Sequence, residues 1–415
     1  MSDPRLALTR RDVVQQLRAV DAAPSSGPFR VGLEQEWHTY CVTNLDRHVH
    51  PDEVLAVAGE AVSLPFGSTV TVEPGGQVEL ATPPLDPWWT GVEALRVDGG
   101  VLREALARAG IATVASGIDL FRDPVRTLRQ PRYDAMEAYF DRTGGAGRRM
   151  MAGSASIQVN IDHGPDVATM DRRWQLAHHI GPALAAAFAC SPDREHRGTR
   201  LGIWEAIDRT RAGPALASGS LQDDWPAYVL DAHLMLLHDD RGRCRPMDVA
   251  LRFGDWVEEG IAGRRPTFDD LTYHCTTLFP PVRPRGWLEL RWLDALPAGL
   301  AEVAIAAVVA VLVDDHATEC AAHACRPVSD AWADAAVHGP RHPGLAQAAS
   351  ATLRAAAEAL DRVPQTQRLA ELVDDALQRW PARGRCPADD LEDRLRRGAG
   401  VADLADPPGE AVEWS

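Results

Sequence analysis

Two glutamates, Glu34 and Glu36, stand two residues apart in a segment whose pattern predicts a β-strand. Side chains alternate between the two faces of a strand, so both carboxylates project to one side, while Val31, Leu33 and Trp37 project to the other. Adjacent buried carboxylates repel one another unless a positive charge lies between them. A divalent cation supplies that charge, and oxygen ligands suit Mg²⁺. The pair therefore predicts a magnesium site on a sheet.

Three further segments repeat this alternation of polar and apolar residues. Their polar positions carry Gln77 and Glu79 in the first segment, Ser156, Gln158, Asn160 and Asp162 in the second, and Glu289 and Arg291 in the third. Glu73 precedes Pro74 and either joins this face or shapes the turn. On any one strand such a face is commonly just exposed to water. Four faces rich in acids and amides predict instead one sheet with a polar site on one side and helices packed on the other.

The composition excludes several classes of function. The chain has 415 residues and a net charge of −16, which argues against nucleic acid or an anionic membrane as a partner. All 43 basic residues are arginine, so lysine-based chemistry is excluded and phosphates must be held by arginine, metal ions or backbone amides. The seven cysteines are scattered without a CxxC pair, which disfavours a disulfide framework or a zinc knuckle.

Two features of the sequence argue against a membrane protein. The N-terminal residues lack the apolar core of a signal peptide. The longest apolar run, over residues 303–313, is too short to span a bilayer and fits a buried helix. We therefore expect a cytoplasmic protein with no membrane partner, and the sequence carries no signal for its oligomeric state.

Periodicity and capping signals predict the supporting elements. Helices are expected over residues 9–20, 51–61, 91–110, 171–190, 300–316 and 345–360, with a strand over 111–115. Residues 223–237 mix helix and strand signals, and 258–272 favour a loop with a short helix. The glycines and arginines of 142–149 predict a mobile loop, which either folds over a phosphate or is a plain connector.

A dense segment over residues 198–211 combines three arginines with Trp204. Arg200 is a candidate clamp for a phosphate or carboxylate, and Trp204 a candidate wall of a pocket. The alternative is a surface helix on which Glu205 pairs with Arg209.

Two weaker patterns are interpreted as structural. His316, Cys320 and His323 would align on one helix face, but no fourth zinc ligand accompanies them, and packing of small residues explains the spacing as well. Cys275 and His178 are interpreted as ordinary buried residues rather than as a nucleophile and a ligand.

The polar strands together resemble a known family. The segments GLEQE (32–36), VEPGGQVEL (72–80), SIQVNID (156–162) and WLELR (287–291) are similar to the signatures of glutamate–cysteine ligases of the plant-type and proteobacterial class. Residues 273–286 resemble the bacterial branch that supplies γ-glutamylcysteine for ergothioneine biosynthesis. The resemblance covers the chain from about residue 30 to about residue 390.

This resemblance implies an α+β fold with a six-stranded antiparallel sheet, curled into a glutamine synthetase-like cup with helices packed outside. It implies a single ligase catalytic domain over 1–395 and a polar tail over 396–415. The polar composition of the C-terminal residues predicts that 402–415 are disordered. The resemblance also implies ATP and Mg²⁺ as cofactors, and glutamate and cysteine as substrates. ATP would phosphorylate the γ-carboxylate of glutamate, and the amine of cysteine would then displace phosphate.

The family motifs also imply a role for each residue of the polar face. The metal ligands would be Glu34, Glu36, Glu79, Gln158 and Glu289. Arg291 would face the transferred phosphoryl group, Arg200 would bind phosphate or substrate carboxylate beside Trp204, and Glu73 would assist the metals or the amine. Clustered acids and arginines suit this chemistry, because an anionic carboxylate must attack an anionic phosphate.

Two neighbours of the paired glutamates depart from the pattern expected of the family. Gln35 and Trp37 stand where smaller or acidic residues are usual, although both should project away from the polar face. Residues that read the cysteine side chain do not transfer from the motifs. A ligase for another amine, and an inactive relative that only binds nucleotide or amino acid, therefore stand as alternatives.

Overall fold

The computed structural model describes residues 7–61, 63–238 and 243–407. Its centre is a seven-stranded antiparallel sheet with the path β2-β3-β1-β5-β9-β8, to which β4 is added alongside β1. The strands are β1 (Val31–Cys41), β2 (Thr69–Val72), β3 (Val78–Ala81), β4 (Ile111–Val114), β5 (Ser156–Ile161), β8 (Val282–Pro284) and β9 (Leu288–Asp294). A separate hairpin joins β6 (Leu236–His238) to β7 (Cys244–Pro246).

The strand count corrects the six strands that the resemblance implies. One edge of the long strand β1 serves two partners, because residues 34–37 pair with β3 and residues 38–41 pair with β4. Within the described ranges the sheet is open, with β2 and β8 at its two ends. The curled cup therefore stays a prediction, whereas the antiparallel sheet with helices around it is confirmed.

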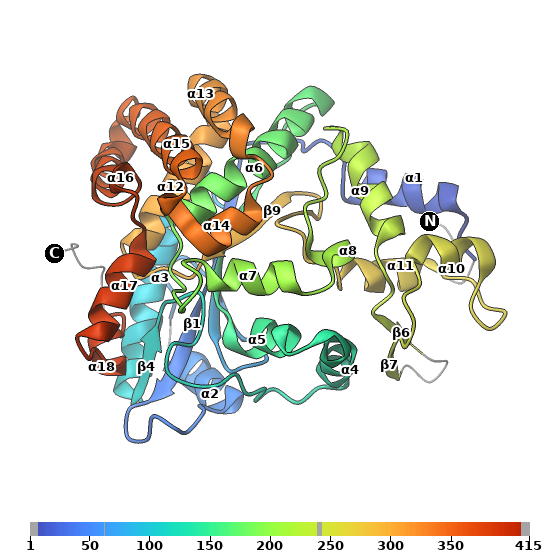
Figure 1. Cartoon of the computed structure of the whole chain (residues 1–415), viewed down its shortest axis with the longest axis horizontal. Helices are drawn as coiled ribbons and strands as arrows, with labels where there is room; N and C mark the ends of the chain where they lie inside the picture. Colours follow the sequence, from blue (N-terminus) through green and yellow to red (C-terminus); the bar gives the residue numbers. More distant parts are fainter. Residues whose placement is uncertain (1–6, 62, 239–242, 408–415) are drawn as a thin grey trace.

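Helices surround the sheet on both faces (Figure 1). The first half of the chain contributes α1 (Arg10–Val20), α2 (Pro51–Ala61), α3 (Trp89–Arg108), α4 (Pro131–Phe140), α5 (Ala146–Gly153), α6 (Val167–Ala187), α7 (Thr199–Ala206) and α8 (Arg209–Ala212). The second half contributes α9 (Leu221–Asp231), α10 (Phe253–Glu259), α11 (Phe268–Cys275), α12 (Leu300–Val313), α13 (Asp315–Cys325), α14 (Trp332–His338), α15 (Pro343–Asp361), α16 (Gln367–Arg379), α17 (Pro387–Arg396) and α18 (Val401–Leu404). None of the helices in the described residues is long and apolar enough to cross a membrane.

Helix α3 covers the apolar face of the sheet. Its Gly99 lies against the side chains of Trp37 and Leu80, and its Gly91 lies against Leu33. Leu33, Trp37 and Leu80 are almost fully buried, as their alternate positions predict. Burial of this face fixes the strand register, because a shift by one residue would turn the carboxylates into the core.

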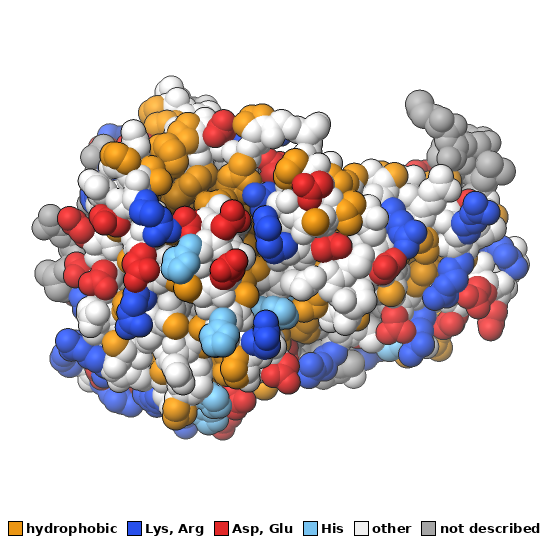
Figure 2. Space-filling model, turned by 90° about the horizontal axis from the view of Figure 1, so that it is seen from above, with side chains coloured by type: hydrophobic (Ala, Val, Ile, Leu, Met, Phe, Trp, Pro, Cys, Tyr) orange, Lys and Arg blue, Asp and Glu red, His pale blue; other side chains and the backbone are white. Residues whose placement is uncertain are grey.

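Most of the other helices lie in three groups around this centre. Helices α6, α12, α13, α15 and α16 gather into one bundle (Figure 1), and α5 contacts both α4 and α7 in a second group. Helices α1, α9, α10 and α11 form the opposite end of the molecule, beside the β6–β7 hairpin. Seen from above, acidic and basic side chains are intermixed over the surface (Figure 2), so the net negative charge is not gathered into one patch on that face.

Most of the predicted elements are confirmed. The predicted cap of the first helix is present, with Thr9 and Asp12 bonded reciprocally. Residues 223–237 resolve into the end of α9 and the start of β6, and the strand at 111–115 is β4.

Two predictions about irregular segments are wrong. The glycine-rich segment 142–149 was expected as a mobile loop, but Gly147 packs against Phe140 and the segment begins helix α5. Residues 402–407 were expected to be disordered, yet Leu404 is buried and Asp406 accepts a hydrogen bond from Trp37. In both segments a contact with a residue outside the segment, Phe140 in one case and Trp37 in the other, decides the structure. The rest of the predicted tail, 408–415, lies outside the described residues.

Gly75 joins the turn before β3 to the end of α5, and replacing it tests that contact. A Cβ atom at Gly75 would lie 2.1 Å from the Ala152 carbonyl oxygen, so the backbone of one segment must move. We expect Gly75→Ala to destabilise the protein by about 1–3 kcal/mol in a urea unfolding experiment. Gly59→Ala is the control, because a Cβ there meets no atom within 4 Å and alanine favours the helix. Equal stability of the two variants would contradict this close contact.

Candidate active site

The register of the central strands places the predicted acidic side chains next to one another. Glu36 of β1 is paired with Glu79 of β3. On the other side of β1, Glu34 is paired with Gln158 of β5. Directly paired residues on one face have Cβ atoms about 4.5–5.5 Å apart. Three strands therefore bring four of the five predicted metal ligands together.

Arg291 connects the fourth strand to this group. Its Nη1 donates to Gln158 Oε1 at 2.6 Å and to Glu289 Oε2 at 3.1 Å. Burial alone would lower the pKa of Arg291, but Glu289, Glu34 and Glu36 outweigh it and raise that pKa. The guanidinium is thus a fixed positive charge at the centre of the polar face.

Two arginines, Arg283 and Arg291, donate hydrogen bonds to the carboxylate of Glu289. Arg283 of β8 donates through Nε and Nη2 to its two carboxylate oxygens, at 2.5 and 3.0 Å. Burial would raise the pKa of Glu289, but Arg283 and Arg291 outweigh burial and lower that pKa to about 2. Glu289 is therefore ionised at every pH at which the protein would work.

The pKa values of the other carboxylates of the polar face are raised, whereas that of Glu289 is lowered. Burial, followed by repulsion from Glu289 and Glu79, raises the pKa of Glu34 to about 7. Burial and the charge of Glu36 raise the pKa values of both Glu73 and Glu79. A nearby positive charge favours the ionised form of such crowded carboxylates and would lower these pKa values.

These donors suit a hard divalent cation, because carboxylate and amide oxygens are its preferred ligands. Among the described residues, however, no three His, Cys, Asp or Glu side chains already surround one point closely enough to hold a metal ion. The arginine pairing of Glu289 accounts for part of this.

A cavity of about 280 Å³ opens beside the polar face. Its lining combines apolar and aromatic side chains with polar and charged ones, namely Glu36, Glu73, Gln77, Arg132, Ser154, Ser156, Arg200 and Arg291. Glu36 is fixed at the cavity wall, because its carboxylate accepts from Ser156 N at 2.8 Å and from Ser156 Oγ at 3.1 Å. The structure thus brings together Glu36, Glu73 and both predicted arginines.

Arg200 is buried rather than exposed on a surface helix. Its Nη2 donates to the Arg291 carbonyl oxygen at 2.8 Å, and its Nη1 lies 3.9 Å from Asp294. Both guanidinium groups lie over the ring of Trp204, with Cζ 6.0 Å from the ring centroid for Arg200 and 5.9 Å for Arg291. Within the described ranges, the buried Trp204 Nε1 has no hydrogen-bond partner. The predicted pocket of Arg200 and Trp204 is therefore present, although Glu205 also lies 3.3 Å from Arg209.

Sequence reasoning missed several residues of this site. Arg283 is paired with Glu289 across β8 and β9, and Asp294 accepts from the Cys190 N–H and the Ser191 hydroxyl. Both residues are more than nine-tenths buried. Asp294 falls on the alternate positions of Leu290 and Trp292, so the alternation of β9 gave no signal for it. The three-residue strand β8 gave no periodicity by which to place Arg283.

The weaker candidates lie on helices α6, α11 and α13. Cys320 Sγ lies 3.7 Å from His316 Nε2 on α13, and the structural interpretation of this pair stays a prediction. His178 is buried, and its Nδ1 contacts the Trp174 carbonyl oxygen at 2.9 Å. Burial raises the pKa of the Cys275 thiol above its ordinary range, which opposes nucleophilic chemistry.

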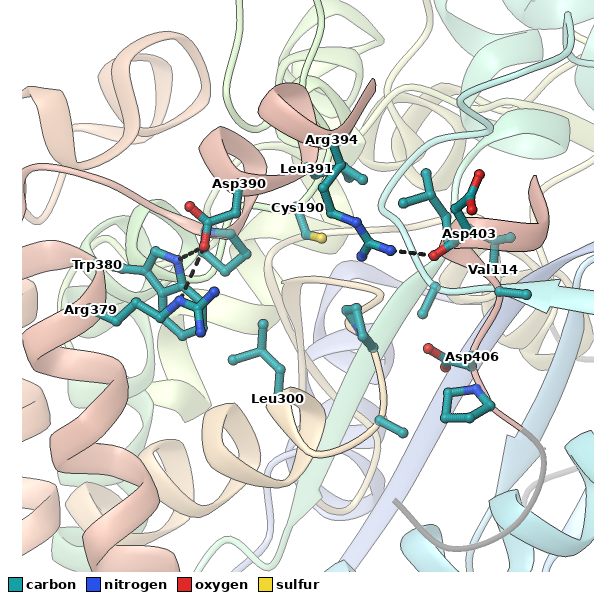
Figure 3. A pocket seen from close by; sticks show the side chains of 17 residues that line it. Val114, Cys190, Leu300, Arg379, Trp380, Asp390, Leu391, Arg394, Asp403 and Asp406 are labelled. Atoms are coloured by element: carbon teal, nitrogen blue, oxygen red, sulfur yellow. Dashed lines mark hydrogen bonds and ion pairs between the residues drawn. The ribbon is translucent and has the colours of Figure 1, made fainter. Parts of the chain in front are cut away.

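A larger cavity, of about 570 Å³, lies behind the sheet (Figure 3). Trp37 projects away from the carboxylates, and its Nε1 donates at 2.9 Å to Asp406 in the cavity wall. The arginines there are engaged, because Arg379 pairs with Asp390 and Arg394 donates to the Asp403 carbonyl oxygen (Figure 3). None of the predicted site residues lines this cavity, which lies between the C-terminal helices and the sheet.

Comparison with known proteins agrees with the geometry. The family model of glutamate–cysteine ligase family 2 (GCS2) matches residues 30–406. The chain is 41% identical to glutamate–cysteine ligase EgtA of Mycolicibacterium smegmatis over 91% of each chain. It is 26% identical to the chloroplastic glutamate–cysteine ligase of Brassica juncea, over 70% of this chain and 61% of that protein.

The fold is also found among solved structures. A bifunctional glutathione synthetase from Pasteurella multocida superposes with a TM-score of 0.52 and 16% identity, over 91% of this chain and 51% of that chain. At this identity the likeness concerns the fold alone. The family match and the relative at 41% identity carry the assignment, and the chain belongs to glutamate–cysteine ligase family 2.

Proposed function

We propose that the polar face of the sheet carries out the ATP-dependent ligation of glutamate to cysteine, giving γ-glutamylcysteine. The family makes the chain a glutamate–cysteine ligase. The observation that carries the proposal is the meeting of raised-pKa carboxylates with two buried arginines beside one cavity. Such a site suits a reaction that must bring a carboxylate and a triphosphate together and then stabilise a transferred phosphoryl group.

The reaction has two steps. The γ-carboxylate oxygen of glutamate attacks the γ-phosphorus of ATP, which breaks the bond to ADP and gives γ-glutamyl phosphate. The nitrogen of cysteine then attacks the acyl carbon, phosphate leaves, and one proton is lost from the amine. No oxidant or reductant is needed.

Arg291 and Arg200 would supply the fixed positive charges in this scheme. Arg291 is held at the centre of the face by Gln158 and Glu289, so it would stabilise negative charge on the phosphoryl group without reorganising. Arg200 is bonded to the backbone of Arg291 and would bind phosphate or the substrate carboxylate beside Trp204. Glu73, whose pKa burial raises, would accept the proton of the incoming amine more readily than an ordinary glutamate.

The five predicted ligands would hold Mg²⁺: Glu34, Glu36, Glu79, Gln158 and Glu289. The ion would neutralise the charges of ATP and the γ-carboxylate when bound. Support comes from the mutual repulsion of the carboxylates, which a cation relieves. Glu289 is balanced by Arg283 and Arg291 and would have to share its carboxylate between them and the metal.

This metal proposal predicts a pH dependence of stability. The pKa of Glu34 in the folded chain, about 7, lies above its ordinary value of 4.5. The metal-free protein should therefore lose stability as the pH rises from about 4.5 through 7, because charging this group opposes folding. Mg²⁺ binds the ionised carboxylates, so it should raise the unfolding temperature more at pH 8 than at pH 6.

Thermal unfolding with and without MgCl₂ at both pH values measures this effect. NaCl at matched ionic strength controls for screening, and Glu34→Gln should reduce the difference between the two pH values. An equal Mg²⁺ effect at both pH values would contradict the assignment of this face as the metal site.

The reaction itself is tested by incubating the purified protein with ATP, Mg²⁺ and glutamate, with and without cysteine. We expect cysteine-dependent ADP release and a product with the mass of γ-glutamylcysteine. ADP without that product would keep the acyl-phosphate chemistry and move the acceptor to another amine. The absence of ADP with every amine tried would overturn the enzymatic proposal.

Several finer points belong to the same proposal. The likeness to EgtA supports the resemblance of residues 273–286 to ligases that serve ergothioneine biosynthesis. We propose that one catalytic domain contains the whole site, in a sheet curved around the substrates. The cytoplasmic location stays a prediction.

A further inference from the structure

The cavity beside the polar face is lined by two chemically different groups of side chains. One group is charged and consists of Glu36, Glu73, Arg132, Arg200 and Arg291. The other group, the methionine end, consists of Met136 of α4 and Met150 and Met151 of α5, with Phe279 and the ring of Trp204. The two rings lie 5.6 Å apart between centroids. Three of the seven methionines of the chain therefore meet in one small cavity.

The position of Met150 and Met151 is fixed by contacts between the end of α5 and the turn before β3. Gly75 lies against the carbonyl of Ala152, the residue after Met151. Ser154 Oγ donates to the Met150 carbonyl oxygen at 2.7 Å, and Gln77 Nε2 donates to the Ser154 carbonyl oxygen at 2.7 Å. The turn that carries Glu73 and the helix that carries the methionines are thus held together.

Only one of the two amino-acid substrates has an uncharged, polarisable end. The side chain of glutamate ends in the carboxylate that reacts, and this group must face the arginines. The side chain of cysteine ends in a thiol, which is a weak hydrogen-bond donor and packs well against thioethers and aromatic rings. A cavity of about 280 Å³ is at the small end of the range for ligand pockets, and it suits amino acids better than a nucleotide.

We propose that Met136, Met150 and Met151, with Phe279, form the subsite for the thiol of the acceptor, and that they select cysteine over serine. This inference rests on the proposed function. Of the two serine hydroxyls in the cavity wall, Ser154 donates to Met150 and Ser156 to Glu36. A serine acceptor with its hydroxyl among the three thioethers would lose hydrogen bonds to water, whereas a thiol, which is a weak hydrogen-bond donor, loses little there.

Polar variants of the methionine end test the subsite. For Met136→Gln and Met151→Gln, made separately, we expect kcat/KM for cysteine to fall about 10- to 100-fold. The KM values for glutamate and ATP should stay within about twofold. When cysteine and serine compete as acceptors, mass spectrometry gives the ratio of the two products. We expect this ratio of cysteine product to serine product to fall about tenfold or more. Met151→Leu keeps the end apolar and should keep the preference.

Met170→Leu is the matched control for loss of a methionine, because Met170 is buried in the core away from the cavity. Thermal unfolding of each variant separates misfolding from a change of specificity. A rise in the KM for glutamate with no change for cysteine would overturn the proposal and place glutamate at this end. An unchanged cysteine-to-serine ratio in folded variants would also overturn it. Failure of the unmodified protein to form γ-glutamylcysteine would instead overturn the proposed function.

Discussion

Replacing Glu36 by glutamine is expected to lower kcat for cysteine-dependent ADP release by about 10³-fold or more, with little change in the fold. Loss of one preorganised charge-stabilising group in an active site costs on the order of 10²–10³-fold. Glu36 should exceed this, because it also faces Glu79 across β1 and β3 and would bind the metal. Glutamine has nearly the same volume, so the packing around Ser156 can be kept.

Steady-state kinetics over a range of Mg²⁺ concentrations measure this effect. The variant should need more Mg²⁺ for its residual activity, whereas a purely structural role would leave the Mg²⁺ dependence unchanged. Glu104→Gln is the control, because Glu104 makes only an exposed pair with Arg108 on α3, and such pairs contribute little. More than a tenth of the activity in Glu36→Gln would contradict a role of Glu36 at the reacting centre.

The polar face could be predicted from the sequence because strand periodicity is local. The spacing of Glu34 and Glu36 predicts a shared face, and the structure places both beside residues of neighbouring strands. The same rule places Trp37 against α3, in the core. Alternation along a strand depends on backbone geometry alone, so it can be predicted without knowing which strands pair.

Features that depend on contacts between distant segments could not be predicted in this way. The pairing of β4 with β1 was missed. No local sequence pattern shows that β3 and β4 pair with successive parts of the same edge of β1. The first four residues of helix α5, 146–149, were predicted as part of a loop because glycine is a poor helix former, yet Gly147 is required where Phe140 leaves no room for a Cβ atom. The methionine end of the cavity depends on this helix, so it was also outside the reach of sequence patterns.

Replacing Arg291 by glutamine is expected to lower kcat by about 10²–10³-fold, the usual result of removing a charge aimed at a transferred phosphoryl group. The structure adds a second expectation for the metal-free protein. Arg291 lowers the pKa values of Glu34, Glu36 and Glu79 against the effect of their burial. Without the guanidinium these carboxylates should ionise at higher pH, so Mg²⁺ should begin to stabilise the variant at a higher pH than the unmodified protein.

Two measurements therefore follow for Arg291→Gln, kcat under saturating substrates and the Mg²⁺-induced shift in unfolding temperature across pH 6 to 9. The Arg283–Glu289 pair remains in the variant, so the β8–β9 edge should stay folded. Arg108→Gln, which removes an exposed guanidinium, should change neither quantity. A fall in kcat with no change in the pH at which Mg²⁺ stabilises the protein would limit Arg291 to the phosphoryl group. Unchanged kcat would exclude it from the reaction, because a charge at the centre of the face cannot be lost without effect if phosphoryl transfer occurs there.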